Sequence, residues 1–142
     1  MSYDLTFLPK PADQSWEEAL AAVGSEPADL PDPEVWERLV AGARQLLGEV
    51  DTFADHDHFE LVHLPTGIQL SYFAGEAGIE VPYWYRGADA ESVVCQVYLL
   101  GRVVEDVTGF AGYDPQLDLT LADAMERTRL AVATFDRIAA HQ

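Results

Sequence analysis

The opening of the chain alternates hydrophobic and polar residues, which is the period-two pattern of a β-strand with one buried face. Tyr3, Leu5 and Phe7 are the hydrophobic members, and polar residues separate them. We therefore expect a strand at residues 3–8, and we expect Pro9 to end it because proline cannot continue a hydrogen-bonded ladder.

Three more strands are expected in the middle of the chain, at residues 59–64, 68–73 and 79–85. Short glycine-containing turns separate them, which is typical of an antiparallel meander. Pro82 lies in the third of these strands and has no N–H to donate, so it predicts an edge strand or a bulge. Residues 51–58 are mostly polar and predict a loop before the meander.

Helical periodicity, N-cap residues and terminal glycines predict about four helices. Their expected ranges are 16–23, 33 to about 48, 89–107 and 121–139. Ser15, Asp32 and Thr120 are the expected N-caps, and Gly24 is the expected end of the first helix. This order of elements predicts a single α+β domain over residues 1–142, in which a meander and the N-terminal strand form one antiparallel sheet packed against the helices.

The long third helix carries the only cysteine, so no intrachain disulfide can form. Cys95 lies within the hydrophobic pattern of Val93, Val97 and Leu100, which predicts a buried and unreactive thiol. Gly101 lowers helix propensity in the middle of the same helix, so it predicts close packing against a neighbouring element.

The net charge of the chain indicates which classes of partner it can bind. There are 25 Asp and Glu residues against 8 Lys and Arg, a formal net charge of −17, while 49% hydrophobic residues indicate a folded domain. Such a surface repels phosphate backbones and anionic lipid, so neither nucleic acid nor a membrane is expected as a partner, whereas a basic protein is. No secretory signal and no membrane-length apolar run occur, which predicts a cytoplasmic protein.

Aromatic residues at the end of the third middle strand predict a recognition surface, because tyrosine and tryptophan make good interface anchors. The residues are Tyr83, Trp84 and Tyr85, joined by Tyr72 of the preceding strand. The alternative is an ordinary core, in which alternate aromatic rings pack beneath the helices.

Acidic residues dominate the same part of the chain, since no lysine or arginine occurs between Arg44 and Arg86. If the outer sheet face and its turns are exposed together, their carboxylates form a negative surface that steers a basic partner. The residues expected to do this are Asp55, Asp57, Glu76 and Glu80. A solvated face without a partner is the alternative.

A later loop adds Asp114 and Gln116 to the expected partner contacts. They belong to the stretch Tyr113-Asp114-Pro115-Gln116, in which the Asp-Pro pair predicts a turn. The turn alone accounts for these residues, and contact with a ligand or partner is the functional interpretation.

A cluster of histidine and aspartate supports an alternative function. His56, His58 and His63, with Asp55 or Asp57, offer the imidazole and carboxylate ligands that bind zinc, iron or manganese. Their spacing is not that of a known metal motif such as His-Glu-x-x-His. A solvated loop or a pH-sensitive surface are the other interpretations. No phosphate-binding loop or nucleophile motif occurs, so no catalytic residue and no cofactor are predicted.

Four short stretches together resemble a group of small acidic bacterial proteins of actinobacterial type. They are MSYDL at 1–5, TGIQLS at 66–71, VPYWY at 81–85 and YDPQ at 113–116. Some similar proteins are immunity proteins of polymorphic toxin systems, so the resemblance implies an inhibitor of a basic toxin or enzyme. It defines no site residues. One alternative is the metal-dependent function. Another is a housekeeping domain that is acidic only because the proteins of its organism are acidic in general. A homodimer is compatible with each of these functions.

Overall fold

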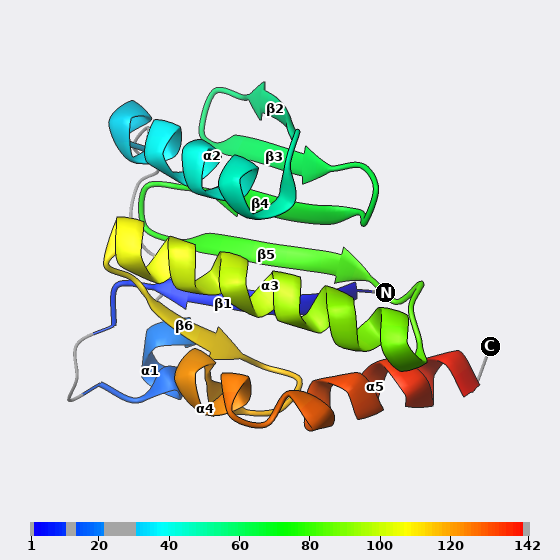
Figure 1. Ribbon diagram of the computed structural model, residues 1–142. Coiled ribbons are helices and arrows are strands. Elements are labelled where there is room, and N and C mark those ends of the chain that lie inside the picture. The colour runs from blue at the N-terminus through cyan, green and yellow to red at the C-terminus, as the bar shows by residue number, and fades with distance from the viewer. Residues whose placement is uncertain (1, 11–13, 22–30, 141–142) are drawn as a thin grey trace.

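A single antiparallel sheet of seven strands organises the chain, as the computed structural model shows for residues 2–10, 14–21 and 31–140 (Figure 1). The strands are β1 (Ser2–Leu8), β2 (Asp51–Ala54), β3 (Phe59–His63), β4 (Ile68–Tyr72), β5 (Ala77–Pro82), β6 (Ala111–Asp114) and β7 (Leu119–Thr120). Their order in the sheet is β2-β3-β4-β5-β1-β6-β7, and every neighbouring pair is antiparallel. The predicted α+β fold is confirmed, with the N-terminal strand in the sheet.

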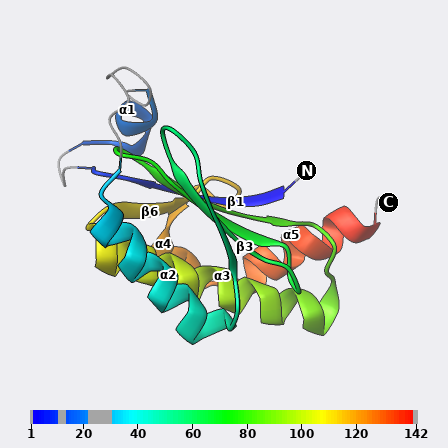
Figure 2. The same ribbon diagram turned by 90° about the horizontal axis from the view of Figure 1, so that it is seen from above.

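The helices form one layer on the sheet. They are α1 (Trp16–Ala21), α2 (Pro33–Leu47), α3 (Gly87–Thr108), α4 (Leu121–Met125) and α5 (Thr128–Ala140). Figure 2 shows α2 to α5 on one face of the sheet and α1 on the other side, near one end of β1. None of the described helices is long and apolar enough to cross a membrane.

The position of β5 corrects the expectation drawn from Pro82. This strand is not at an edge, because it lies between β4 and β1 near the middle of the sheet. Pro82 is its last residue and lies opposite Ser2, the first residue of β1. A proline is tolerated at this position because the ladder ends there. The strand therefore stops before the aromatic residues that were expected to continue it.

The loop expected at residues 51–58 is also wrong in part, since Asp51–Ala54 form β2. All four residues are exposed, so this edge strand has no buried side to impose a hydrophobic alternation. The pattern that reveals a strand in a sequence is therefore missing from it.

The predicted helix starts are confirmed by their caps. The Asp32 carboxylate accepts a hydrogen bond from the Glu34 N–H at 2.9 Å, and the Ser15 hydroxyl accepts one from the Glu18 N–H at 3.1 Å. The expected stop at Gly24 lies outside the described residues. The last helix was expected to be continuous and is broken instead, because a tight turn separates α4 from α5; its Arg127 N–H bonds to the Ala124 carbonyl at 3.0 Å.

Helix α3 confirms one expectation and overturns another. A Cβ on Gly101 would lie 3.0 Å from the Leu121 side chain and 3.3 Å from that of Leu5, so the predicted close packing is confirmed. Cys95 was expected to be buried and is exposed. It lies on the solvent side of the helix with Leu99, because Val94 and other neighbours supply the buried side.

Candidate functional site

The sheet face opposite α2 to α5 is left open by the described helices over most of its area (Figure 2). Side-chain alternation decides what this face carries. Tyr3 and Leu5 are buried on the helical side of β1, so Asp4 between them points to the open side. In the same way, Glu80 is exposed on β5 while its neighbour Ile79 is buried.

The register of the sheet brings these two carboxylates together. Asp4 lies directly opposite Glu80, and Gln69 continues the row on β4. Further along the open side are Glu60 of β3 and Asp51 of the edge strand β2. We call the surface formed by Asp4, Asp51, Glu60, Gln69 and Glu80 the acidic sheet face.

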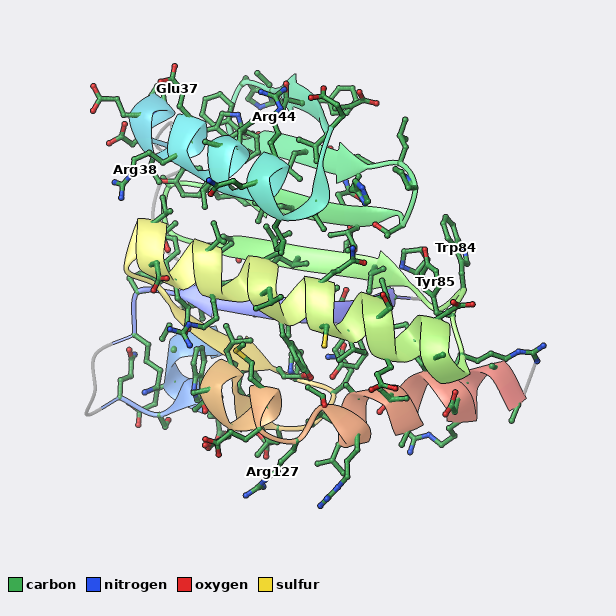
Figure 3. All side chains as sticks on the ribbon, in the orientation of Figure 1. Glu37, Arg38, Arg44, Trp84, Tyr85 and Arg127 are labelled. Atoms are coloured by element: carbon green, nitrogen blue, oxygen red, sulfur yellow. The ribbon has the colours of Figure 1, made fainter. Side chains whose placement is uncertain are left out.

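The acidic sheet face itself contains no basic side chain, and Lys10, which follows β1, lies over the ring of Trp16 in α1, 5.5 Å from its centroid. None of the seven strands contains a lysine or arginine. The arginines belong to the helices or the residues beside them; Figure 3 labels Arg38, Arg44 and Arg127 there. Like charges directly opposite each other destabilise a sheet, so the paired carboxylates raise the free energy of the fold with no strand cation to offset them.

Hydrogen bonds hold the backbone of Asp4 in place. The Asp4 N–H donates to the Gln116 side-chain oxygen at 2.8 Å, and the Gln116 amide donates to the Asp4 carbonyl at 2.7 Å. The Ser2 hydroxyl donates to the Asp4 carboxylate at 2.6 Å. Gln116, which was expected to contact a partner, is partly exposed and positions a residue of the acidic sheet face.

Asp114 was also expected to contact a partner, and this expectation is corrected because its exposed fraction is 0%. Its carboxylate accepts hydrogen bonds from the hydroxyls of Tyr3 and Tyr98, the latter at 2.7 Å, and from the Leu117 N–H at 3.2 Å. Burial raises the pKa of both tyrosines, and the nearby carboxylate raises each pKa further. Asp114 therefore ties β1, α3 and β6 together from inside the core.

Two of the expected aromatic anchors lie in or against the core. Tyr72 is buried beneath α2, with its ring parallel to that of Trp36 at 6.4 Å between centroids, so it is not part of a recognition surface. Tyr83 is half-buried and packs edge-on against Phe135 at 5.0 Å. Tyr72 therefore fits the alternative interpretation, an ordinary core, whereas Tyr83 packs against that core and keeps part of its surface exposed.

Trp84 remains accessible, with 70% of its surface exposed. Its ring lies over Gly67 in the β3–β4 turn. A Cβ atom at position 67 would lie only 2.9 Å from the indole and 3.0 Å from the Pro82 ring, so the indole packs closely on this glycine. Tyr85, labelled beside it in Figure 3, donates a hydrogen bond to the Thr66 carbonyl at 2.5 Å. The exposed indole therefore borders the end of the sheet at which the row of Asp4 and Glu80 lies.

The remaining expected carboxylates lie elsewhere. Asp55 and Asp57 are in the β2–β3 turn and Glu76 is in the β4–β5 turn, which are at the end of the meander opposite to Trp84. The structure thus separates the expected aromatic and acidic residues. Glu80 alone lies between the two ends, on the acidic sheet face.

The expected metal ligands come together only in part. One ligand atom each from Asp55, Asp57 and His58 lies within 4.8 Å of the others. His56 bonds to the Asp55 carboxylate at 2.9 Å and is not in this group, and His63 is buried on the helical side of β3. Two of the three histidines expected as ligands are therefore outside the cluster.

Hydrogen bonding explains the cluster without a metal. The His58 Nδ1 lies 2.8 Å from the Asp57 carboxylate, and its Nε2 lies 3.5 Å from that of Glu60. The hydrogen bond to Asp57 raises the pKa of His58, and Glu60 adds to the shift. The His58 ring also stacks on Phe73 at 4.8 Å. A metal ion at this cluster would therefore compete with a proton for the His58 imidazole.

Sequence reasoning missed Asp4 and Gln69, which complete the row with Glu80. Alternation around Tyr3 and Leu5 was sufficient to place Asp4 on the outer side of its strand. What no local pattern supplies is that β1 pairs with β5, more than half the chain away.

No protein-family model matches the chain, and neither a curated protein nor a solved structure shows significant similarity to it. The resemblance to small acidic bacterial proteins therefore stays a prediction.

Proposed function

We propose that this chain is a cytoplasmic protein-binding module, of the immunity-protein type, which inhibits a basic partner protein by covering it with the acidic sheet face. The observation that carries the proposal is the cross-strand pair of carboxylates at Asp4 and Glu80, neither of which forms an ion pair with a described residue. A protein that retains a locally destabilising arrangement on an open face is expected to use it in function.

The partner is expected to present lysine or arginine side chains. Bound between Asp4 and Glu80, a cation would offset the repulsion that the two carboxylates experience in the free protein. The exposed indole of Trp84 would cover apolar surface or stack on an arginine at the same end of the sheet. Steering by the whole negative surface would speed the encounter.

The experiment is capture of the partner from a lysate of the source organism, with three tagged proteins side by side. These are the wild type, Glu80→Lys and Asp106→Lys, where Asp106 is exposed on α3 and the change in net charge is the same. We expect a basic protein that the wild type and Asp106→Lys retain and Glu80→Lys loses. Equal capture by both variants would count against the acidic sheet face.

The same comparison tests the alternative that the acidity is background of the proteome. In that case position does not matter, and the two variants behave alike at every salt concentration. Glu80→Lys replaces a like-charge pair by an opposite-charge pair, so its loss of binding would not reflect unfolding.

The second candidate is metal binding by Asp55, Asp57 and His58, whose ligand atoms lie within 4.8 Å of one another. Titration with zinc at slightly alkaline pH tests it, because deprotonation then frees the imidazole. Saturable binding that is lost in His58→Gln and kept in His63→Gln would support this function. Binding that both variants keep would exclude this cluster.

A further inference from the structure

The two edges of the sheet differ in how they are protected. At one edge β7 has only two residues and leads directly into α4. At the other edge β2 has four residues, contains no proline or lysine, and is exposed along its whole length. Short strands, prolines and charged side chains, lysine above all, are the usual devices against pairing with another chain, and β2 has only its modest length and the single charge of Asp51.

The hydrogen bonds of the β2–β3 hairpin show which backbone groups of β2 are free. The Asp55 N–H donates to the His58 carbonyl at 2.9 Å, which makes these residues a hydrogen-bonded pair. Such pairs alternate along an antiparallel ladder, so Phe53 bonds to β3 whereas the N–H and C=O groups of Thr52 and Ala54 point away from the sheet.

The layer beneath β2 is incomplete. On β3 the helix-facing Leu61 is fully buried, but its partner Thr52 on β2 is exposed. A hollow of about 320 Å³ lies there between α2 and β2. It is lined by Trp36, Glu37, Val40, Ala41, Arg44 and Thr52. An additional strand beside β2 would place alternate side chains over this hollow.

The charges around β2 indicate which kind of strand can pair with this edge. Asp51 lies in β2, with Glu49 before it and Asp55 after it. A second copy of this chain would bring the same carboxylates into contact, and each copy carries a formal charge of −17. On the other side of β2, Arg44 lines the hollow, so a basic side chain would be repelled there. A strand with basic residues on the side of Asp51 and apolar residues on the side of the hollow is complementary to both.

We propose that the β2 edge binds an extended basic segment of the partner by strand addition, with an apolar side chain of that segment in the hollow beside α2. Backbone hydrogen bonds to Thr52 and Ala54 give affinity, and the alternation of basic and apolar side chains gives specificity. Phe53, 56% exposed on the open side of β2, offers a face on which a lysine or arginine can stack. The inference rests on the proposed function for the basic character of the partner.

The test uses a defined probe, a peptide of alternating lysine and valine of about eight residues with blocked ends. Amide proton–nitrogen NMR spectra of the full chain are recorded during titration with this peptide. We expect saturable shifts at the Thr52 and Ala54 amides. A peptide of the same charge, N-methylated at the backbone positions that face β2, is expected to bind at least about tenfold more weakly, since it loses two hydrogen bonds.

Two variants make the result specific. Thr52→Pro removes an outward N–H without removing a bond to β3, and it is expected to abolish the shifts; Thr52→Ala keeps the N–H and is expected to retain them. Equal binding of both peptides, or no shifts at millimolar peptide, would overturn the inference. Shifts confined to Asp4 and Glu80 would overturn it while supporting the proposed function, so the two failures are distinguishable.

Discussion

Asp4 and Glu80 lie directly opposite each other on β1 and β5, and both point away from the helical layer. Neither forms an ion pair within the described part of the chain. The Asp4 carboxylate accepts a hydrogen bond from the Ser2 hydroxyl, whereas the Glu80 carboxylate accepts none from the described residues. Glu80 is therefore the more informative of the two to change.

Removing the charge of Glu80 is expected to stabilise the protein. Glu80→Gln should raise the free energy of unfolding by about 0.2–1 kcal/mol at low ionic strength, because it relieves repulsion across the strands. The gain should shrink as salt is added and screens the wild-type pair. Denaturant unfolding at low and high salt measures both effects.

The control for this prediction is Asp106→Asn, which removes one negative charge from the exposed side of α3. It is expected to change stability by less than Glu80→Gln does. If the two variants gain equally, the effect is one of net charge and the cross-strand pair has no special cost.

Truncating Asp114 is expected to be strongly destabilising. Asp114→Ala would leave the buried hydroxyls of Tyr3 and Tyr98 with only each other as partners, at a cost of about 2–5 kcal/mol. Tyr98→Phe removes one donor only and should cost about 1 kcal/mol. Thermal or chemical unfolding of both variants checks the ranking, and the reverse order would contradict the hydrogen-bond network described here.

Stability is expected to depend on the protonation of His58. Its pKa in the fold is raised above the usual 6.5, chiefly by the hydrogen bond to Asp57, so protonation favours the folded state. This contribution is complete below the unfolded pKa and is lost as pH rises through the folded pKa.

NMR titration of the imidazole measures this directly. We expect the pKa of His58 to fall towards 6.5 in Asp57→Asn. The wild type should also lose more stability than this variant between mildly acidic and mildly alkaline pH. An unchanged pKa of His58 in Asp57→Asn would show that the hydrogen bond is not its cause.

Two tryptophans should respond to substitution in opposite ways. Trp84→Ala is expected to change stability little, because the ring is largely exposed, and to speed dissociation of the partner. Trp36→Ala should cost about 3–5 kcal/mol, because its buried ring stacks on Phe59 at 5.3 Å. Unfolding curves and dissociation rates together separate an anchor from a core residue.

Local patterns were sufficient to predict most of the fold. Tyr3, Leu5 and Phe7 alternate because only one side of β1 is buried, and Asp32 marks a helix start through a cap that a sequence displays. β2 was not predicted because an edge strand that is exposed on both sides lacks the alternation of hydrophobic and polar residues. Pro82 was misread because the end of a central strand tolerates proline as well as an edge does.

The candidate site was predicted less well, because it depends on long-range pairing. Glu80 was named as a partner-binding residue, but its neighbour Asp4 comes from the other end of the chain through the β1–β5 register. Asp114 was named for its turn signal, and its hydrogen bonds to Tyr3 and Tyr98 place it in the core. The position of an acidic residue in the sequence therefore does not show whether its carboxylate lies on the open sheet face or in the core.

The measurement that tests the central claim most directly is the rate of association between this chain and the captured basic protein as a function of ionic strength. The wild type, Glu80→Lys and Asp106→Lys are compared. The account predicts that Glu80→Lys slows association roughly tenfold or more at low salt, while Asp106→Lys stays close to the wild type. Equal rates for the two variants would contradict the claim that the acidic sheet face binds the partner.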